Sequence, residues 1–209
     1  MGGLRFNFSI QHLLAAAHFS RHVSELERAH TAELFGAFFE EILWFSSACV
    51  LSCSAGLEAY INELFIDRAE HFQTVDRPKS GRSRSRASGS ETQDKFDKAL
   101  WLKQEPLLDR GSRPTEDVVA LFELRNRITH FRPQWDGTIG SHAELSRTLE
   151  NLFVPSPFLA DTESLFPRRW ATHGCTKWAV KSCIDFLTVF ESRSGVPRRV
   201  AKHATRLSG

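Results

Sequence analysis

The sequence predicts an all-α protein that folds as an up-and-down helical bundle with a long helical segment near its N-terminus. Apolar residues recur at three- and four-residue intervals through most of the chain, which is the period of an amphipathic helix. No proline interrupts residues 31–72. Hydrophobic residues make up 41% of the sequence and include 17 phenylalanines, enough to fill the core of one domain spanning residues 1–209.

The N-terminal third is expected to hold two helical segments. Residues 11–29 form the first, and residues 31–72 continue the helical pattern for about forty residues. An unbroken helix of that length would extend about 60 Å, longer than such a bundle needs. We therefore expect a break near 46–47 or within 52–54, close to Gly56, which weakens a helix.

Residues 76–93 are predicted to be a flexible loop. From Arg77 to Ser90 the chain has five basic residues, no acidic residue and no large apolar side chain, so it cannot offset the entropy of becoming ordered. Two interpretations remain open. The segment is a soluble linker, or it contacts RNA phosphates through Arg82, Arg84 and Arg86.

A short helix is predicted at 94–104, and another helix follows Pro114. Thr115 is its expected N-cap, and Pro133 stops the pattern because the residue before a proline is disfavoured in helical geometry. Arg125 projects into the apolar stripe of this helix or its edge, where a charge is costly unless it is paired or used. The stripe consists of Leu121, Leu124, Ile128 and Phe131.

The C-terminal third combines an irregular segment, 131–167, with one long helix. Within the irregular segment a short helix is expected at 141–149. The final helix is predicted to begin at Pro167 and to span 168–192, after which a glycine and a proline end it. The remaining residues, 193–209, form a basic tail that we expect to be frayed.

Composition narrows the class of protein. The formal net charge is only +2 and the pI is about 8.4, so overall charge does not indicate a nucleic-acid-binding protein. The N-terminus lacks the pattern of a signal peptide, and the longest apolar run is far short of the ~20 residues that span a bilayer. A soluble, cytoplasmic protein without membrane contact is expected. Its cysteines lack Cys-x-x-Cys spacing and are expected to be buried thiols: Cys49, Cys53, Cys175 and Cys183.

The sequence contains no Gly-rich phosphate loop, no His-Glu-x-x-His and no Gly-x-Ser-x-Gly motif. His18 and His22 are one helical turn apart, but no acidic or cysteine partner is placed beside them. Neither a metal nor a cofactor is expected.

Residues 125–130 read Arg-Asn-Arg-Ile-Thr-His near the end of a predicted helix. An Arg-Asn-x-x-x-His motif in this position resembles the HEPN superfamily, many of whose prokaryotic members are metal-independent endoribonucleases that act as toxins or in phage defence. The resemblance implies that Arg125 and His130 form the catalytic pair and that Asn126 is the polar residue following the arginine.

Residues 54–65 resemble the first core helix of HEPN proteins, in which a Leu-Glu-x-x-Ile-Asn arrangement often occurs. Here it places Glu58 and Asn62 one helical turn apart on the border of the apolar face. In one interpretation both side chains are merely solvated. In the other, Glu58 orients Arg125 or helps to poise His130.

A His–Arg pair suits the cleavage of RNA, which carries its own nucleophile, the 2′-hydroxyl. Histidine can take and give protons near neutral pH, and arginine matches the phosphoryl oxygens with a permanent charge. One pair is too little for both proton transfers. The resemblance implies the remedy, a homodimer in which two motifs share one cleft. Arg127 and Arg132 are further candidate contacts for RNA.

Other interpretations remain open. In HEPN toxins silenced by a nucleotidyltransferase antitoxin, a tyrosine commonly sits two residues after the histidine. Arg132 occupies that position here, which excludes control by tyrosine modification at that site but leaves another antitoxin or regulatory protein open. The main alternative is a non-catalytic HEPN-like module that binds a protein, a nucleotide or RNA, with Arg125 in a structural ion pair to Glu58. A third interpretation is an unrelated helical bundle in which the hexapeptide 125–130 matches the motif by chance.

Overall fold

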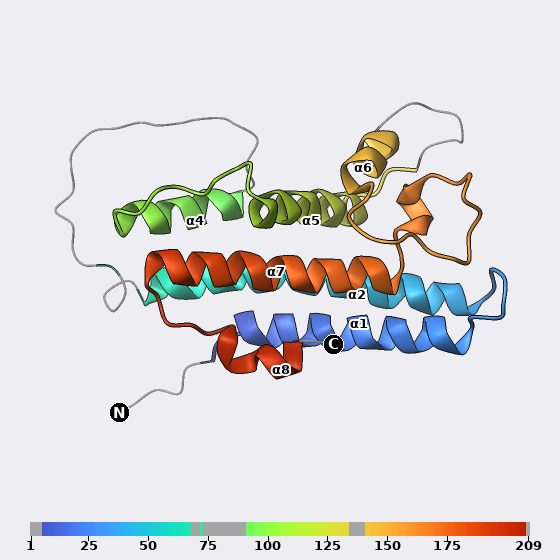
Figure 1. Ribbon diagram of the computed structural model, residues 1–209, viewed down its shortest axis with the longest axis horizontal. Coiled ribbons are helices and arrows are strands. Elements are labelled where there is room, and N and C mark those ends of the chain that lie inside the picture. Colours follow the sequence, from blue (N-terminus) through green and yellow to red (C-terminus); the bar gives the residue numbers. More distant parts are fainter. Residues whose placement is uncertain (1–5, 68–71, 73–90, 134–140, 208–209) are drawn as a thin grey trace.

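The computed structural model describes residues 6–67, 72, 91–133 and 141–207, and all regular elements within these ranges are helical (Figure 1). This confirms the predicted all-α class. The principal helices are α1 (Ser9–Ala29), α2 (Phe38–Ile66), α4 (Glu91–Leu102), α5 (Arg113–Thr129), α6 (Ser141–Leu149) and α7 (His173–Ser194). Three short turns complete the described elements: η1 (Leu165–Arg169), η2 (Ala201–His203) and α8 (Ala204–Leu207).

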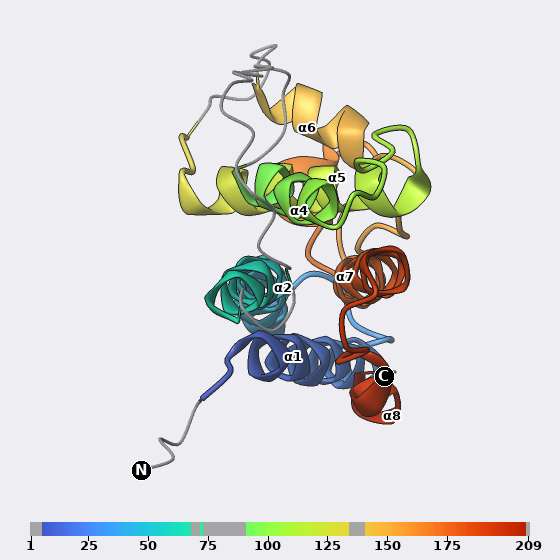
Figure 2. The ribbon, with the colours of Figure 1, turned by 90° about the vertical axis from the view of Figure 1, so that its left-hand side faces the viewer.

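The bundle is layered around α2 and α7. Viewed end on, α1 lies below these two helices, and α4 and α5 lie above them (Figure 2). Helix α2 is antiparallel to α1, and α7 runs in the same direction as α2 (Figure 1). Helix α5 packs across both α2 and α7, and α6 packs on α5. The core therefore lies between α1, α2 and α7 and continues upward beneath α5.

Helix α2 differs from the prediction at its start and in its continuity. It begins at Phe38, because residues 30–37 reverse the chain after α1, where the His30 ring stacks on Phe38 with centroids 4.1 Å apart. The expected break is wrong, since α2 is continuous over 29 residues, about 43 Å. Ser54 donates a hydrogen bond to the Val50 carbonyl within the helix and leaves it intact.

Gly56 serves packing rather than a helix break. A Cβ atom at this position would lie 2.9 Å from Cδ2 of Leu13 and 3.3 Å from the carbonyl oxygen of Ser9, both on α1. The glycine therefore permits α1 and α2 to approach closely, and this contact explains a residue that the sequence alone presents as a weak point.

The termini of the other helices test the remaining boundaries. The predicted helix 141–149 is confirmed without change, and the first helix begins two residues earlier than predicted. Residues 91–93, assigned to the basic loop, belong to α4, whereas 76–90 lie outside the described residues. In α5 the N-cap is Ser112 rather than Thr115.

The final helix begins later than predicted. Pro167 lies in the turn η1 and follows a cis peptide bond, and α7 starts at His173, where the hydroxyl of Thr172 accepts a hydrogen bond from the Gly174 backbone. Gly195 ends α7 in the left-handed conformation, with φ of 66°.

The basic tail is not frayed along its described length. Its apolar residues Val196, Val200 and Leu207 are buried, and α8 packs on α1. A buried polar cluster fixes the tail further: Arg199 forms ion pairs with Glu63 (3.1 Å) and Asp67 (3.4 Å) of α2. Burying these side chains together satisfies charges that would be costly alone, which is why this basic segment docks.

Helix α2 is also the one described helix long and apolar enough to cross a membrane, with a mean hydropathy of 1.4 over the relevant window, of which 44% is buried. Core helices of soluble proteins pass the same test. Here α2 contacts α1, α4, α5 and α7 and is the central helix of the bundle. All four cysteines are buried and unpaired, as the sequence predicts.

Candidate active site at the end of helix α5

The candidate motif lies on the last turn of α5 and the residue that follows. Helix α5 has Pro114 in its first turn, where a missing backbone N–H costs nothing, and it ends at Thr129. His130 is the C-cap residue, and its backbone N–H donates to the Asn126 carbonyl at 2.9 Å. The hydroxyl of Thr129 donates to the Arg125 carbonyl at 2.8 Å. These bonds close the helix and fix where His130 leaves it.

Arg125 is held by two oxygen acceptors. Its Nη2 lies 2.6 Å from Oε1 of Glu58 on α2, and its Nη1 donates to Oδ1 of Asn126 at 2.9 Å. The guanidinium also lies over the Phe122 ring, with Cζ 6.0 Å from the ring centroid. The Arg125 side chain remains 28% exposed and that of Glu58 remains 38% exposed. The arginine is therefore positioned by its neighbours and still accessible from solvent.

His130 and Asn62 are less constrained. Both are exposed. Among the described residues, the His130 side chain forms no hydrogen bond or ion pair. Asn62 lies one turn after Glu58 on the same face of α2, without a hydrogen bond to the motif. The structure thus places Arg125 in direct contact with both Asn126 and Glu58. His130 follows as the C-cap of α5, and Asn62 makes no hydrogen bond to the motif.

The candidate RNA-contacting arginines have separate environments. Arg132 is exposed immediately after the motif, and Arg127 is half-buried on the side of α5 that faces α6. Arg82, Arg84 and Arg86 lie outside the described residues.

His142 lies beside the motif, although no pattern in the sequence marks it as a site residue. Its ring stacks on Phe131, with centroids 5.5 Å apart, and meets Phe166 edge-on at 5.0 Å. The Nε2 atom is buried without a hydrogen-bond partner among the described residues. Burial and the nearby positive charge of Arg127 lower the pKa of His142, although a hydrogen bond with the Arg132 backbone acts in the opposite direction.

This environment predicts a pH dependence of stability. A histidine in an unfolded chain has a pKa of about 6.5. Because folding lowers the pKa of His142, protonation below about pH 6.5 favours the unfolded state, and the free energy of unfolding falls as the pH decreases through that window. In His142→Phe, which keeps an aromatic ring there, we expect a smaller loss of stability than in wild type between about pH 7.5 and 5. Urea unfolding at both pH values measures this. Equal losses in the two proteins would contradict the assignment.

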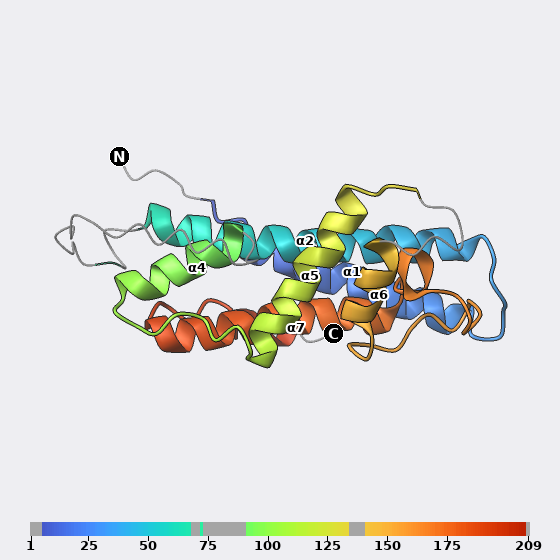
Figure 3. The same ribbon diagram turned by 90° about the horizontal axis from the view of Figure 1, so that it is seen from above.

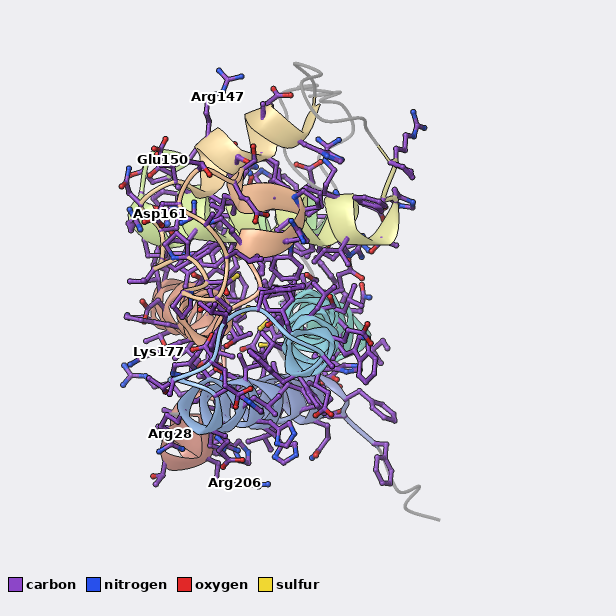
Figure 4. The ribbon with its side chains drawn as sticks, turned by 90° about the vertical axis from the view of Figure 1, so that its right-hand side faces the viewer. Arg28, Arg147, Glu150, Asp161, Lys177 and Arg206 are labelled. Atoms are coloured by element: carbon purple, nitrogen blue, oxygen red, sulfur yellow. The ribbon has the colours of Figure 1, made fainter. Side chains whose placement is uncertain are left out.

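Two hollows in the described surface lie away from the motif. One, of about 460 Å³, lies between α1, α7 and α8, with Lys177 and Lys181 among its lining residues. The other, of about 400 Å³, is bounded by α6 and the segment leading to η1 and includes Arg147, Glu150 and Arg169. Figure 4 shows Arg147 and Glu150 at the α6 end of the molecule and Lys177 nearer to α1.

No group of three or more His, Cys, Asp or Glu side chains is placed to hold a metal ion within the part of the chain that the structure describes. Comparisons with protein-family models, with curated proteins and with solved structures give no match for this chain.

Proposed function

We propose that this protein is a cytoplasmic, metal-independent endoribonuclease of the HEPN type, with Arg125, Asn126 and His130 in its active site. One observation carries the proposal. The Arg125 guanidinium is held by Glu58 and Asn126 yet stays accessible, and the exposed His130 follows at the end of the same helix. A fixed, permanently charged arginine and an exposed imidazole at the end of the same helix are the kinds of group that internal transesterification of RNA requires.

The roles follow from the chemistry of the side chains. Arg125 neutralises charge that develops on the phosphoryl oxygens, with one face of its guanidinium already committed to Glu58. His130 transfers a proton, either from the attacking 2′-hydroxyl or to the leaving 5′-oxygen. Asn126 fixes the arginine through its amide oxygen. No step requires a metal ion, because RNA supplies the nucleophile itself.

A single copy supplies one His and one Arg for two proton transfers, so the active form is proposed to be a homodimer. The proposed setting is toxin–antitoxin control or phage defence, in which a regulatory protein restrains the nuclease. Such a partner cannot act by modifying a tyrosine two residues after the histidine, because Arg132 occupies that position.

The test is incubation of the purified protein with single-stranded RNA in excess EDTA. We expect RNA fragments to accumulate while DNA of the same sequence stays intact, because DNA lacks the 2′-hydroxyl. Arg125→Ala is expected to lose the activity. Arg113→Ala is the matched control, because Arg113 forms an i, i+4 ion pair with Asp117 at the other end of α5. Intact RNA after incubation with a correctly folded wild-type dimer would overturn the proposal.

The 2.6 Å contact between Arg125 and Glu58 also favours a second candidate, a non-catalytic HEPN-like module that binds a protein, a nucleotide or RNA. In that function the ion pair is structural, and truncating one partner costs stability by leaving the other half-buried and unpaired. The two functions separate in Glu58→Gln. A structural pair predicts a lower melting temperature and no cleavage in either protein, whereas the nuclease predicts measurable cleavage that falls when the arginine loses its anchor.

A further inference from the structure

The outer face of α2 carries a regular stripe that the core does not use. Its members are spaced alternately four and three residues apart, which is the spacing of the contact seam between two packed helices. Trp44 is 60% exposed and Leu51 is 40% exposed, an unusual position for large apolar side chains. We call this stripe the α2 seam: Trp44, Ala48, Leu51, Ala55, Glu58 and Asn62.

The composition of α2 matches the core of a protein interface. Between Glu41 and Glu58 the helix has no charged residue, and it contains no Lys or Arg anywhere. Interface cores are depleted of charge and enriched in aromatic residues, and tryptophan is the residue most often found to dominate binding. From Trp44 to Asn62 the seam extends about 27 Å.

We propose that a second copy of this chain docks on the α2 seam, with the two α2 helices antiparallel about a two-fold axis near Leu51. The pattern is self-complementary in that arrangement. Ala48 of one copy lies opposite Ala55 of the other, so small side chains allow close approach, while Leu51 meets its own counterpart. Trp44 lies opposite Glu58. No like charges face each other, as a two-fold interface requires.

This dimer face adjoins the candidate active site. Glu58 belongs both to the seam and to the ion pair with Arg125, and the C-terminal end of α5 crosses above the middle of α2 (Figure 3). A two-fold axis at the middle of α2 therefore places both motif-bearing helix ends on one side of the dimer. Trp44 of the second copy lies beside Glu58, whose carboxylate can accept a hydrogen bond from the indole N–H. The proposal rests on the proposed function, which calls for a homodimer, and it names the face through which the second copy completes this site.

The charges around the seam favour a second copy over a lipid surface. Helices that lie on membranes carry Lys and Arg beside their apolar face. The charged residues that α2 itself places along this face are acidic: Glu40 and Glu41 before the seam and Glu58 within it. Anionic lipid would repel these carboxylates, whereas the seam pairs with itself without charge conflict.

The first test is sedimentation at micromolar concentration. Wild type is expected at twice the chain mass of 23.7 kDa, and Leu51→Lys at the monomer mass, because the axis would bring two lysines together. Val189→Lys on α7 is the matched control, since Val189 is 41% exposed, and it should remain a dimer. A native helical circular dichroism spectrum and a cooperative melt exclude misfolding, because loss of the dimer by itself lowers the melting temperature. A wild-type monomer, or a dimer that survives Leu51→Lys, would overturn the proposal. So would flotation of wild type with phosphatidylcholine–phosphatidylglycerol vesicles in place of dimerisation.

The second test reads the register. The four native cysteines are buried, so under mild oxidation disulfides should form only between cysteines introduced on the surface. A mixture of Ala48→Cys and Ala55→Cys proteins should form a disulfide between the two variants, and Leu51→Cys should link to itself, whereas Val189→Cys should not. Self-linking of Ala48→Cys would indicate a parallel pairing and contradict the model of antiparallel helices. If the expected cross-links form but the protein does not cleave RNA, the dimer face stands and the proposed nuclease function is wrong. If a monomer cleaves RNA, the nuclease function stands and the dimer face is wrong.

Discussion

Replacing His130 by alanine is expected to reduce RNA cleavage by about 10²–10⁴-fold, the usual contribution of a general acid–base group, without lowering the melting temperature. The side chain is exposed and forms no hydrogen bond or ion pair with any other described residue. The helix end that it caps is closed by its backbone N–H, which alanine retains. The loss should therefore appear in the rate of the cleavage step and leave the fold unchanged.

His18→Ala is the matched control for this measurement, because His18 is an exposed helical histidine on α1. Single-turnover rates and thermal melts should be recorded for wild type and both variants from parallel purifications. If His130→Ala retains activity within a few-fold of wild type, the cleavage belongs to another site or to a contaminant, and the assigned role of His130 is wrong.

The largest expected effect on stability comes from Arg199→Ala. Its guanidinium joins Glu63 and Asp67 of α2 and lies over the Tyr60 ring, with Cζ 5.4 Å from the ring centroid. Breaking a buried ion pair by removing one partner typically costs about 3–5 kcal/mol. We expect a value near the lower end, roughly 3 kcal/mol, since Glu63 keeps its hydrogen bonds from the backbone of Ser9.

Urea unfolding measures this change, and the adjacent Arg198→Ala provides the control because Arg198 is exposed. The control should lie within about 0.5 kcal/mol of wild type. A loss below about 1 kcal/mol in Arg199→Ala would mean that the ion pairs do not anchor the tail. Release of residues 196–207 should also appear as faster backbone hydrogen exchange in that segment.

The sequence predicts the local elements better than their ends. Apolar periodicity suffices for α1, a helix of 21 residues whose amphipathic pattern is uninterrupted. It fails for α2 in two ways. The turn before Phe38 has no proline to mark it, and Gly56 resembles a break although its real partner, Leu13, lies on another helix. The sequence does not predict docking of the tail for a similar reason. Arg199 lies in a basic segment, and its ion-pair partner Glu63 is far away along the chain.

The candidate site is likewise predictable from the sequence only where one helix determines it. Helical geometry correctly predicts that Leu121, Leu124 and Ile128 face the core and that Arg125 lies at their edge. It fails for Phe131, the last member of the predicted stripe, which is 46% exposed because α5 ends at Thr129. The contact between Arg125 and Glu58 depends on how α5 crosses α2, which spacing along the chain does not determine. His142 was missed because its contact with Phe131 requires α6 to fold back over the end of α5. Its only sequence signal is a histidine in the first turn of a predicted helix.

The most direct test of the central claim is the chemistry of the cleaved ends. Wild type should be incubated in EDTA with an RNA oligonucleotide, and with the same oligonucleotide carrying a single 2′-deoxy nucleotide at the position that is cut. If Arg125 and His130 promote attack by the 2′-hydroxyl, the RNA products end in 2′,3′-cyclic phosphate or 3′-phosphate, and the deoxy substitution blocks the cut. Products with 3′-hydroxyl ends, or undiminished cleavage at the deoxy position, would contradict that mechanism.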